Sequence, residues 1–362
     1  MLRIRGSAFA TACALVLLST VAFAGTGTAA AQEAVGVSDP QELQNITEDL
    51  DGDYVLTEDI DASDIDFEAI GDRTTPFTGT LDGNGHTVSG LTVGSSSNRP
   101  IQDTVGLFGV IGENGSVEGI GIEDATVVGY QDVGGLAGIN NGEVARSYVD
   151  ADVGGFAAVG GLVGNNDGRI MGSYSTGEVN ATGNSVGGVV GTNVGNVTEA
   201  YAGTVLTVSP DSTATGGAVG AGFGNSTNVY WDTNVSGTTE SGAGTGLTTE
   251  EMTGERATES MEGFGFDSAW RTTDGYPVLG WQPEGAEATP PDPDDGTNGD
   301  GDDDDDDDGD GDGDDGTDGN GVTDEPGGSG SDTGGSEGMP GFGVLAAFAA
   351  LVCGAFLHGR AR

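Results

Sequence analysis

A short glycine motif recurs along the middle of the chain, and its spacing restricts the fold more than any other feature. Each copy places two apolar residues between two glycines, and the first glycines of consecutive copies lie 29, 26, 27 and 29 residues apart. The copies begin at Gly106, Gly135, Gly161, Gly188 and Gly217. A period near 27 without helical spacing suits short strands joined by turns, so that equivalent residues of successive repeats stack. The sequence therefore predicts an all-β chain wound as a right-handed parallel β-helix. A β-sandwich, the alternative, would not explain side chains that recur in phase.

Three kinds of side chain recur in phase with the motif and are predicted to form ladders along the coil. The aliphatic ladder is Val144, Ile170 and Val197. The amide ladder is Asn140, Asn166 and Asn193, beside a turn where Asn tolerates left-handed backbone. The aromatic ladder is Tyr148, Tyr174, Tyr201 and Tyr230. Tyrosines that point outward would offer a stacking platform for sugars, but the neighbouring Val and Ile residues favour a place in the core.

The repeats resemble the GLUG repeat, which is named for its Gly-Leu-x-Gly core. Residues 105–235 hold four or five copies, and residues 76–88 are similar to the opening rung that precedes many extracellular β-helix and GLUG regions. The first and last copies depart most from the pattern: Gly109 is six residues from Gly115, where inner copies have four, and Ala218 replaces a branched residue. GLUG repeats also occur in some large immunoglobulin-cleaving metalloproteases. Their H-E-x-x-H motif is absent from this sequence, so that activity is not expected.

Both ends of such a coil need a cover, because an uncovered last rung is an open sheet edge. Residues 32–104 are predicted to hold a small N-terminal α/β cap and the first rungs, with Asp39 as a helix N-cap, Pro40 at the first position and Glu42 at the third. Residues 236–283 are predicted to form the C-terminal cap from a short helix and bulky side chains. The bulky side chains are Trp270, Tyr276, Pro277, Val278, Leu279 and Trp281.

The N-terminus predicts export from the cell. Residues 1–31 carry two arginines, an apolar run and then small residues, which is the layout of a secretory signal peptide. Cleavage after Ala24 and cleavage after Ala31 both fit this layout. The only two cysteines, Cys13 and Cys353, lie in this segment and in the apolar C-terminal segment. An exported chain that loses both segments would therefore contain no disulfide.

The C-terminus predicts attachment to the membrane. Residues 339–362 place an apolar stretch before two arginines, as in a stop-transfer helix. With Pro340, Gly341 and Phe342 ahead of that stretch, the segment resembles the PGF-CTERM sorting signal of haloarchaeal surface proteins. The resemblance implies that an archaeosortase removes the transmembrane helix and that a lipid replaces it. An unprocessed transmembrane helix is the alternative, and the membrane is a partner in both cases.

The charge of the chain is extreme. It carries 59 Asp and Glu against 10 Arg and no Lys, which gives a net charge of −49. This charge repels phosphate, so nucleic acid is not expected as a partner, and it opposes compaction unless molar salt screens it. Residues 284–338 are rich in Asp and Gly and are predicted to be a disordered spacer. Residues 308–313 match the opening of a calcium loop, but Gly319 stands where that loop needs Glu, so no calcium site is predicted.

The segment between the two ends is poor in catalytic groups. Its one histidine, His86, lies in a glycine-rich turn and is expected to hydrogen-bond a turn carbonyl, and neither Cys nor Lys is present. Three Asp with two Arg nearby could meet across rungs, as carboxylates do in polysaccharide lyases and hydrolases, but we expect them to be solvated surface acids. They are Asp82, Asp103 and Asp132, with Arg146 and Arg169. No catalytic, cofactor-binding or metal-binding residue is predicted.

Six Asn-x-Ser/Thr sequons are predicted N-glycan sites on surface turns of the exported chain. They begin at Asn45, Asn114, Asn180, Asn196, Asn225 and Asn234. Together these features predict a non-catalytic, membrane-anchored cell-surface protein for adhesion, surface binding or envelope structure, adapted to high salt, with a surface-layer glycoprotein or a carbohydrate as partner. The alternative is an extracellular polysaccharide lyase or glycoside hydrolase, which would need a groove that gathers at least three carboxylates and an Arg.

Overall fold

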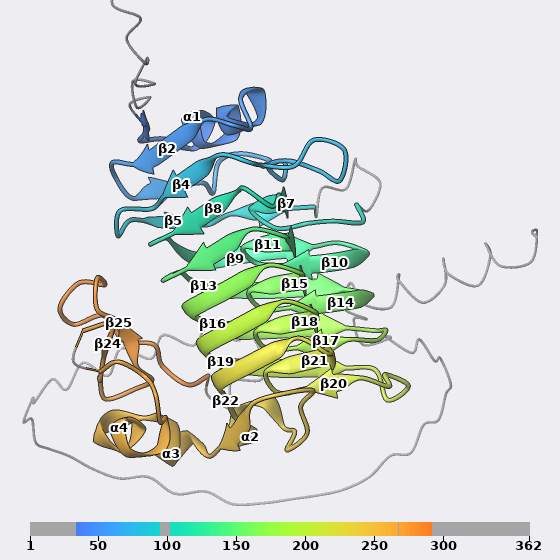
Figure 1. Ribbon diagram of the computed structural model, residues 1–362, viewed down its shortest axis with the longest axis vertical. Helices are drawn as coiled ribbons and strands as arrows, with labels where there is room; N and C mark the ends of the chain where they lie inside the picture. The colour runs from blue at the N-terminus through green and yellow to red at the C-terminus, as the bar shows by residue number, and fades with distance from the viewer. Residues whose placement is uncertain (1–33, 95–101, 267, 292–362) are drawn as a thin grey trace, which may run out of the picture. The chain divides into compact units, whose positions relative to one another are not determined.

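The computed structural model describes residues 34–94, 102–266 and 268–291. These ranges form a coil of parallel strands around one long hydrophobic core (Figure 1). The predicted signal peptide, the spacer beyond residue 291 with its calcium-loop match, and the sorting signal at Pro340, Gly341 and Phe342 lie outside the described residues.

Three sheets run along the coil. The largest contains β1 (Val35–Val37), β2 (Asp53–Leu56), β3 (Ile60–Asp61), β4 (Thr80–Asp82), β5 (Thr87–Ser89), β6 (Thr92–Val93), β8 (Ser116–Glu118), β9 (Gly121–Val128), β12 (Glu143–Ala145), β13 (Tyr148–Gly155), β16 (Arg169–Ala181), β19 (Asn196–Val208), β22 (Asn225–Asp232) and β23 (Thr245–Leu247). The second contains β10 (Gln131–Gly134), β14 (Ala157–Gly160), β17 (Val186–Gly187) and β20 (Thr215–Gly216). The third contains β7 (Phe108–Ile111), β11 (Ala137–Asn140), β15 (Val163–Asn166), β18 (Val190–Asn193) and β21 (Val219–Gly222).

The predicted parallel solenoid is confirmed by the strand register. In the largest sheet Val144 pairs with Ile170 and Ile170 with Val197, so the aliphatic ladder forms as expected. All three side chains are buried in the core cluster. Among the described strands of the three sheets every pairing is parallel, and the antiparallel pair is the separate ribbon of β24 (Trp270–Arg271) and β25 (Val278–Leu279).

The repeated glycines are explained by how closely the chain packs on itself. A Cβ added at Gly161, the first glycine of its copy, would lie 2.3 Å from the carbonyl oxygen of Gly188 on the next rung. A Cβ added at Gly164, the second glycine, would lie 2.5 Å from the backbone nitrogen of Val133 in the facing sheet. A side chain is therefore excluded at both positions by backbone atoms that cannot move independently. The Leu or Val between the glycines is free to fill the core.

A column of left-handed residues turns the largest sheet through a corner. Arg146, Glu199 and Asn228 have φ between 48° and 54°, and Gly119 and Gly172 occupy the same place on their rungs with φ of 66° and 59°. The three Asn residues of the amide ladder do not use the left-handed backbone that Asn tolerates, since none of them has positive φ. The amide ladder itself forms: Asn140 Nδ2 donates to Asn166 Oδ1, and Asn166 Nδ2 donates to Asn193 Oδ1, both at 2.8 Å.

The N-terminal end of the coil is closed by a short helix, α1 (Pro40–Asn45), followed by a 3-10 turn, η1 (Ile46–Glu48). Asp39 is the N-cap, and its carboxylate accepts a hydrogen bond from the backbone nitrogen of Glu42 at 2.8 Å. Leu43 and Ile46 are completely buried in the same core cluster as the rungs. The helix therefore covers the open end of the core, as predicted.

The C-terminal side departs from the expected cap. After β22 the chain forms α2 (Thr233–Ser236) and β23, which continues the largest sheet by one strand. The following segment, residues 248–289, holds α3 (Thr249–Met252), η2 (Gly254–Arg256), α4 (Ala257–Ser260), β24 and β25. From α3 and α4, which lie beyond β22 at the end of the coil, it runs back along the outer face of the largest sheet, where β24 and β25 lie (Figure 1). We call residues 248–289 the strap.

Candidate functional site

The tyrosine ladder forms in register, but it lies on the outside of the coil. Tyr148, Tyr174 and Tyr201 pair in succession, and their rings stack at 5.0 and 4.8 Å between centroids with nearly parallel planes. They belong to a second hydrophobic cluster, separate from the core, that also contains strap residues. The rings are buried, as expected, but the expectation that they face the inside of the coil is wrong. The rings are also unavailable as a sugar platform because the strap covers them.

The strap runs back along this ladder toward the N-terminal rungs. Tyr230 Oη donates to the carbonyl of Glu262 at 2.8 Å, and Tyr201 Oη donates to the carbonyl of Pro277 at 2.7 Å. Further along the strap, Trp281 Nε1 donates to the carbonyl of Arg146 at 2.9 Å. Tyr201 and Tyr230 therefore each supply both a buried ring and a hydrogen bond to the strap.

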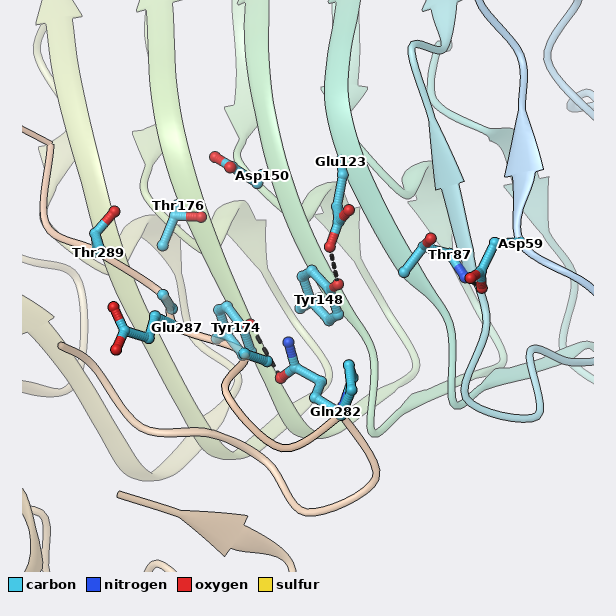
Figure 2. A pocket seen from close by; sticks show the side chains of 13 residues that line it. Asp59, Thr87, Glu123, Tyr148, Asp150, Tyr174, Thr176, Gln282, Glu287 and Thr289 are labelled. Carbon is cyan, nitrogen blue, oxygen red and sulfur yellow. Dashed lines mark hydrogen bonds between the residues drawn. The ribbon is translucent and has the colours of Figure 1, made fainter. Parts of the chain in front are cut away.

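A cleft of about 400 Å³ opens where the end of the strap meets the outer face of the sheet (Figure 2). Small-molecule sites in proteins have volumes of this order. Consecutive rungs supply one wall and the strap supplies the other. The polar side chains that line it are Asp59, Thr87, Glu123, Tyr148, Asp150, Tyr174, Thr176, Gln282, Glu287 and Thr289.

Four carboxylates give the cleft its charge. Glu123 accepts a hydrogen bond from Tyr148 Oη, which fixes one of them against the wall. Partial removal from water raises the pKa of the Asp150 carboxyl, a hydrogen bond from Thr176 opposes that effect, and the charge of Asp124 adds to it. Burial also raises the pKa of the Tyr148 hydroxyl, with the bond to Glu123 as the second cause. Tyr148 is therefore a neutral hydrogen-bonding group in this wall.

Gln282 brings the one amide of the described lining to the floor of the cleft. The residue is only 6% exposed. Its Oε1 accepts hydrogen bonds from Tyr174 Oη at 3.1 Å and from the backbone nitrogen of Leu279 at 2.8 Å. With the oxygen held from two sides, the amide nitrogen points between the tyrosines into the cleft (Figure 2).

The carboxylates singled out in the sequence do not come together. Asp82 lies in β4, whereas Asp132 lies in β10 of a different sheet. Asp132 is 8% exposed and pairs with Arg73, so it is not the solvated acid that was expected. Burial raises the pKa of the Asp132 carboxyl, the charge of Arg73 lowers it, and the charge of Asp103 raises it. Of the residues singled out in the sequence, Asp103 is therefore the one that lies near Asp132. The two arginines are elsewhere: Arg146 pairs with Glu118 at 2.6 Å, and Arg169 begins β16.

His86 does not form the side-chain bond that was expected. Its Nδ1 lies 3.0 Å from Oδ1 of Asp59, a carboxylate one rung away, rather than against a turn carbonyl. The same carboxylate oxygen accepts the backbone nitrogen of Thr87 at 3.0 Å. Asp59 is thereby held at the N-terminal edge of the cleft.

The sequence reading missed this cleft, although a signal was present. Strand residues two apart share a face, so Tyr148 lies on the same face as Asp150 and Asp152, while Val149, Ala151 and Val153 face the core. The two acids identify the outer face, and the ladder tyrosine shares their parity. The part contributed by the strap carries no such pattern, because it is brought there from more than 100 residues away.

The sequons occupy varied positions. Five of the six asparagines are exposed, and Asn180 is half-buried within β16. Asn196 and Asn225 are partners on adjacent rungs, and Asn225 Nδ2 donates to Asn196 Oδ1 at 3.0 Å. Their glycosylation stays a prediction.

In the described ranges, no three His, Cys, Asp or Glu side chains are grouped closely enough to hold a metal ion. None of the helices in these ranges has the length and apolar character that crossing a bilayer requires.

Comparison with known proteins places the repeat in a recognised family. The family described as "The GLUG motif" matches residues 157–180, which span β14, β15 and most of β16. The chain carries a GLUG motif. The match is the repeat that was read from the sequence, and it falls in the middle of the solenoid.

Two curated proteins are similar over part of the chain. Halomucin from Haloquadratum walsbyi is 37% identical over 137 residues, which is 34% of this chain and 1% of halomucin. A protein of Evansella cellulosilytica, named provisionally as a Gly-rich membrane protein, is 38% identical over 95 residues, 25% of this chain and 10% of that protein. The chain therefore spans only a small fraction of the length of either relative.

One solved structure has a similar fold. It is a crystal structure from Bacteroides ovatus, described as a candidate immunoglobulin A1 protease, with a TM-score of 0.53 and 19% identity. The match covers 69% of this chain and 93% of the other. At this identity the likeness concerns the fold alone.

Proposed function

We propose that this chain is a cell-surface protein whose solenoid is a rigid module for surface binding or envelope structure. The observation that carries the proposal is the GLUG solenoid itself, together with its similarity to halomucin and to a protein named for the membrane. The net charge of −49 supports a location in a salt-rich medium, where short-range screening allows an acidic surface to stay compact.

We propose in addition that both termini are processed. The signal peptide at residues 1–31 would direct export, and the sequence around Pro340, Gly341 and Phe342 would direct replacement of the C-terminal helix by a lipid on the outer face of the membrane. These proposals rest on the sequence pattern described above.

Surface display is tested by antibody labelling of intact cells that express the full chain, with antibody raised against the solenoid and permeabilised cells as the control. We expect full labelling without permeabilisation. Labelling that requires permeabilisation would overturn the proposal. The intact mass of the extracted protein then tests processing: a C-terminus near Phe342 with added lipid mass is expected, and an unmodified Arg362 would contradict the lipid anchor.

A further inference from the structure

The cleft between strap and coil combines two kinds of hydrogen-bonding group that call for the same kind of ligand. Its carboxylates, on Asp59, Glu123, Asp150 and Glu287, accept hydrogen bonds. The amide nitrogen of Gln282, held in place through its own oxygen, donates them. A ligand that satisfies both must donate and accept within a few ångströms, and a hydroxyl group does both at one atom.

The charge and the spacing of the acids exclude other ligands. Glu123 and Asp150 come from successive rungs, which lie about 4.8 Å apart in a parallel sheet, and Asp59 lies two rungs before Glu123. The described residues form no group of three acids close enough for one metal ion. No Arg or His belongs to the described lining, so anionic ligands are repelled. An organic cation would match the acids but would offer no acceptor to the Gln282 amide nitrogen.

We propose that the cleft binds a short neutral saccharide along the coil axis, with its hydroxyls shared between Asp150, Glu123 and Gln282. The volume of about 400 Å³ suits a short saccharide rather than a long chain enclosed on all sides. The tyrosine rings take no part in stacking on the sugar, because Tyr148 and Tyr174 stack on each other. Recognition is therefore by hydrogen bonds, and it rests on the proposed surface location, which gives the cleft access to extracellular glycans.

The proposal is tested by isothermal titration of the full chain in molar NaCl with maltose, cellobiose and chitobiose. Digalacturonate serves as an acidic counterpart and spermidine as a cationic one. We expect at least one neutral disaccharide to bind and neither charged probe to do so. Absence of binding by all three neutral disaccharides, or binding of spermidine alone, would overturn the proposal.

Three variants locate the site. Asp150→Asn and Gln282→Glu each remove a proposed contact, and each should weaken binding about tenfold or more. Asp152→Asn is the matched control, because Asp152 lies two residues along the same strand and outside the cleft lining, and it should change affinity less than twofold. Equal weakening by Asp152→Asn would point to diffuse charge and refute the site.

Two further measurements separate loss of a ligand contact from loss of strap docking, and the binding proposal from the proposed function. Trypsin cleavage after Arg271, whose guanidinium donates to the carbonyls of Gln282 and Pro283, reports whether a variant still docks its strap. A docked Gln282→Glu variant with unchanged affinity would contradict the role of the amide. Failure of surface labelling would remove the proposed function while leaving saccharide binding in solution intact, so the two proposals fail in different experiments.

Discussion

At the scale of single residues, the solenoid depends on polar side chains that repeat inside it. Asn140 and Asn166 are completely buried, and each amide satisfies the next one along the axis. Asn140 also accepts from the backbone nitrogen of Gly142 at 3.1 Å, so the ladder holds the turn that joins two sheets. A buried amide without a hydrogen-bond partner would destabilise the fold by about 1–3 kcal/mol. The amide ladder avoids this loss because each Asn has a partner on the neighbouring rung.

Replacement of Asn166 by Leu should therefore destabilise the fold by about 2–4 kcal/mol, because it removes one of the two acceptors of Asn140 Nδ2 and the donor to Asn193 Oδ1 together. Denaturant unfolding in molar salt measures the change. Asn225→Leu is the control, since its bond to Asn196 is exposed and should be worth less than about 1 kcal/mol. Equal effects of the two substitutions would show that burial of the ladder does not matter.

The two stacked sequons make a second prediction at this scale. Asn196 and Asn225 lie on adjacent strands about 4.8 Å apart, which leaves no room for two glycans side by side. We expect a given chain to carry a glycan at one of them at most, and more often at Asn196, because Asn225 uses its amide nitrogen as a donor. Glycopeptide mass spectrometry decides the matter, with Asn114 as an independent sequon for comparison. Peptides modified at both positions would contradict the prediction.

The repeat period was enough to predict which residues stack, because parallel strands place the same phase of each turn in one column. It was not enough to predict on which side of the sheet the tyrosines lie. Tyrosine suits both a core and a covered outer face. The side is decided by the spacing of two residues within β13, which puts Tyr148 on the same face as Asp150 and Asp152, and not by the repeat period. Half of the cleft was beyond prediction, since Gln282 and Glu287 reach it through long-range docking. The spacer boundary at 284 was wrong for the same reason: Ala288 is buried and bridges to Tyr276.

At the scale of elements, the strap docks on a surface prepared for it. A Cβ added at Gly203 in β19 would lie 2.3 Å from the ring of Tyr276, so the missing side chain makes room for the strap. Tyr276 Oη donates to the buried Asp232 carboxylate at 2.7 Å, which fixes the ring in that space. The ladder, the glycine and the strap therefore depend on one another, whereas the core of the coil does not involve them.

Gly203→Ala should release the strap and leave the coil folded. Overpacking of this kind costs about 1–3 kcal/mol. We expect it to weaken docking of the strap rather than folding of the coil, because the ring of Tyr276 must move. Trypsin cleavage after Arg271 should become faster, with an unchanged β signal in circular dichroism. Gly154→Ala is the control, since the nearest atom to its added Cβ is 3.7 Å away. An undisturbed strap in Gly203→Ala would refute this account of docking.

The strap should also come off at high pH. Burial raises the pKa of Tyr201 and Tyr276 above the ordinary value of 10.0, and the negative charge of Asp232 adds to the effect at Tyr276. Because the pKa of each tyrosine is higher in the folded state than in the unfolded state, burial of the neutral hydroxyl stabilises the docked strap fully below pH 10. This stabilisation is lost as pH rises beyond 10. We expect tyrosinate absorbance to appear together with strap release, in one cooperative step. Gradual ionisation centred on the ordinary value, with the strap still docked, would contradict this.

At the scale of the whole molecule, stacked contacts along the core oppose the repulsion of a strongly acidic surface. Near 1 M salt the screening length is about 3 Å, so repulsion between rungs is confined to direct neighbours. The described arginines are too few to neutralise the acids, and pairs such as Arg146 with Glu118 are at the surface and individually weak.

Removal of salt should therefore unfold the coil, and molar salt should restore it. Circular dichroism followed through dialysis measures the loss and return of the β signal. A spectrum that stays unchanged below about 0.1 M salt would show that the core alone overcomes the charge. Replacement of the salt by an equal osmotic concentration of sucrose is the control, because sucrose does not screen charge.

The reversed course of the strap decides where a mechanical load would act. The chain leaves the described fold beside Asp150 and Thr176, at the flank of the coil, and not at its last rung. Tension applied from the C-terminal side would first peel the strap from the tyrosines, one hydrogen bond at a time. Extension of the strap would then dissipate the pull before any rung was loaded. The way the strap is attached thus separates a load on the C-terminal side from the rungs of the coil.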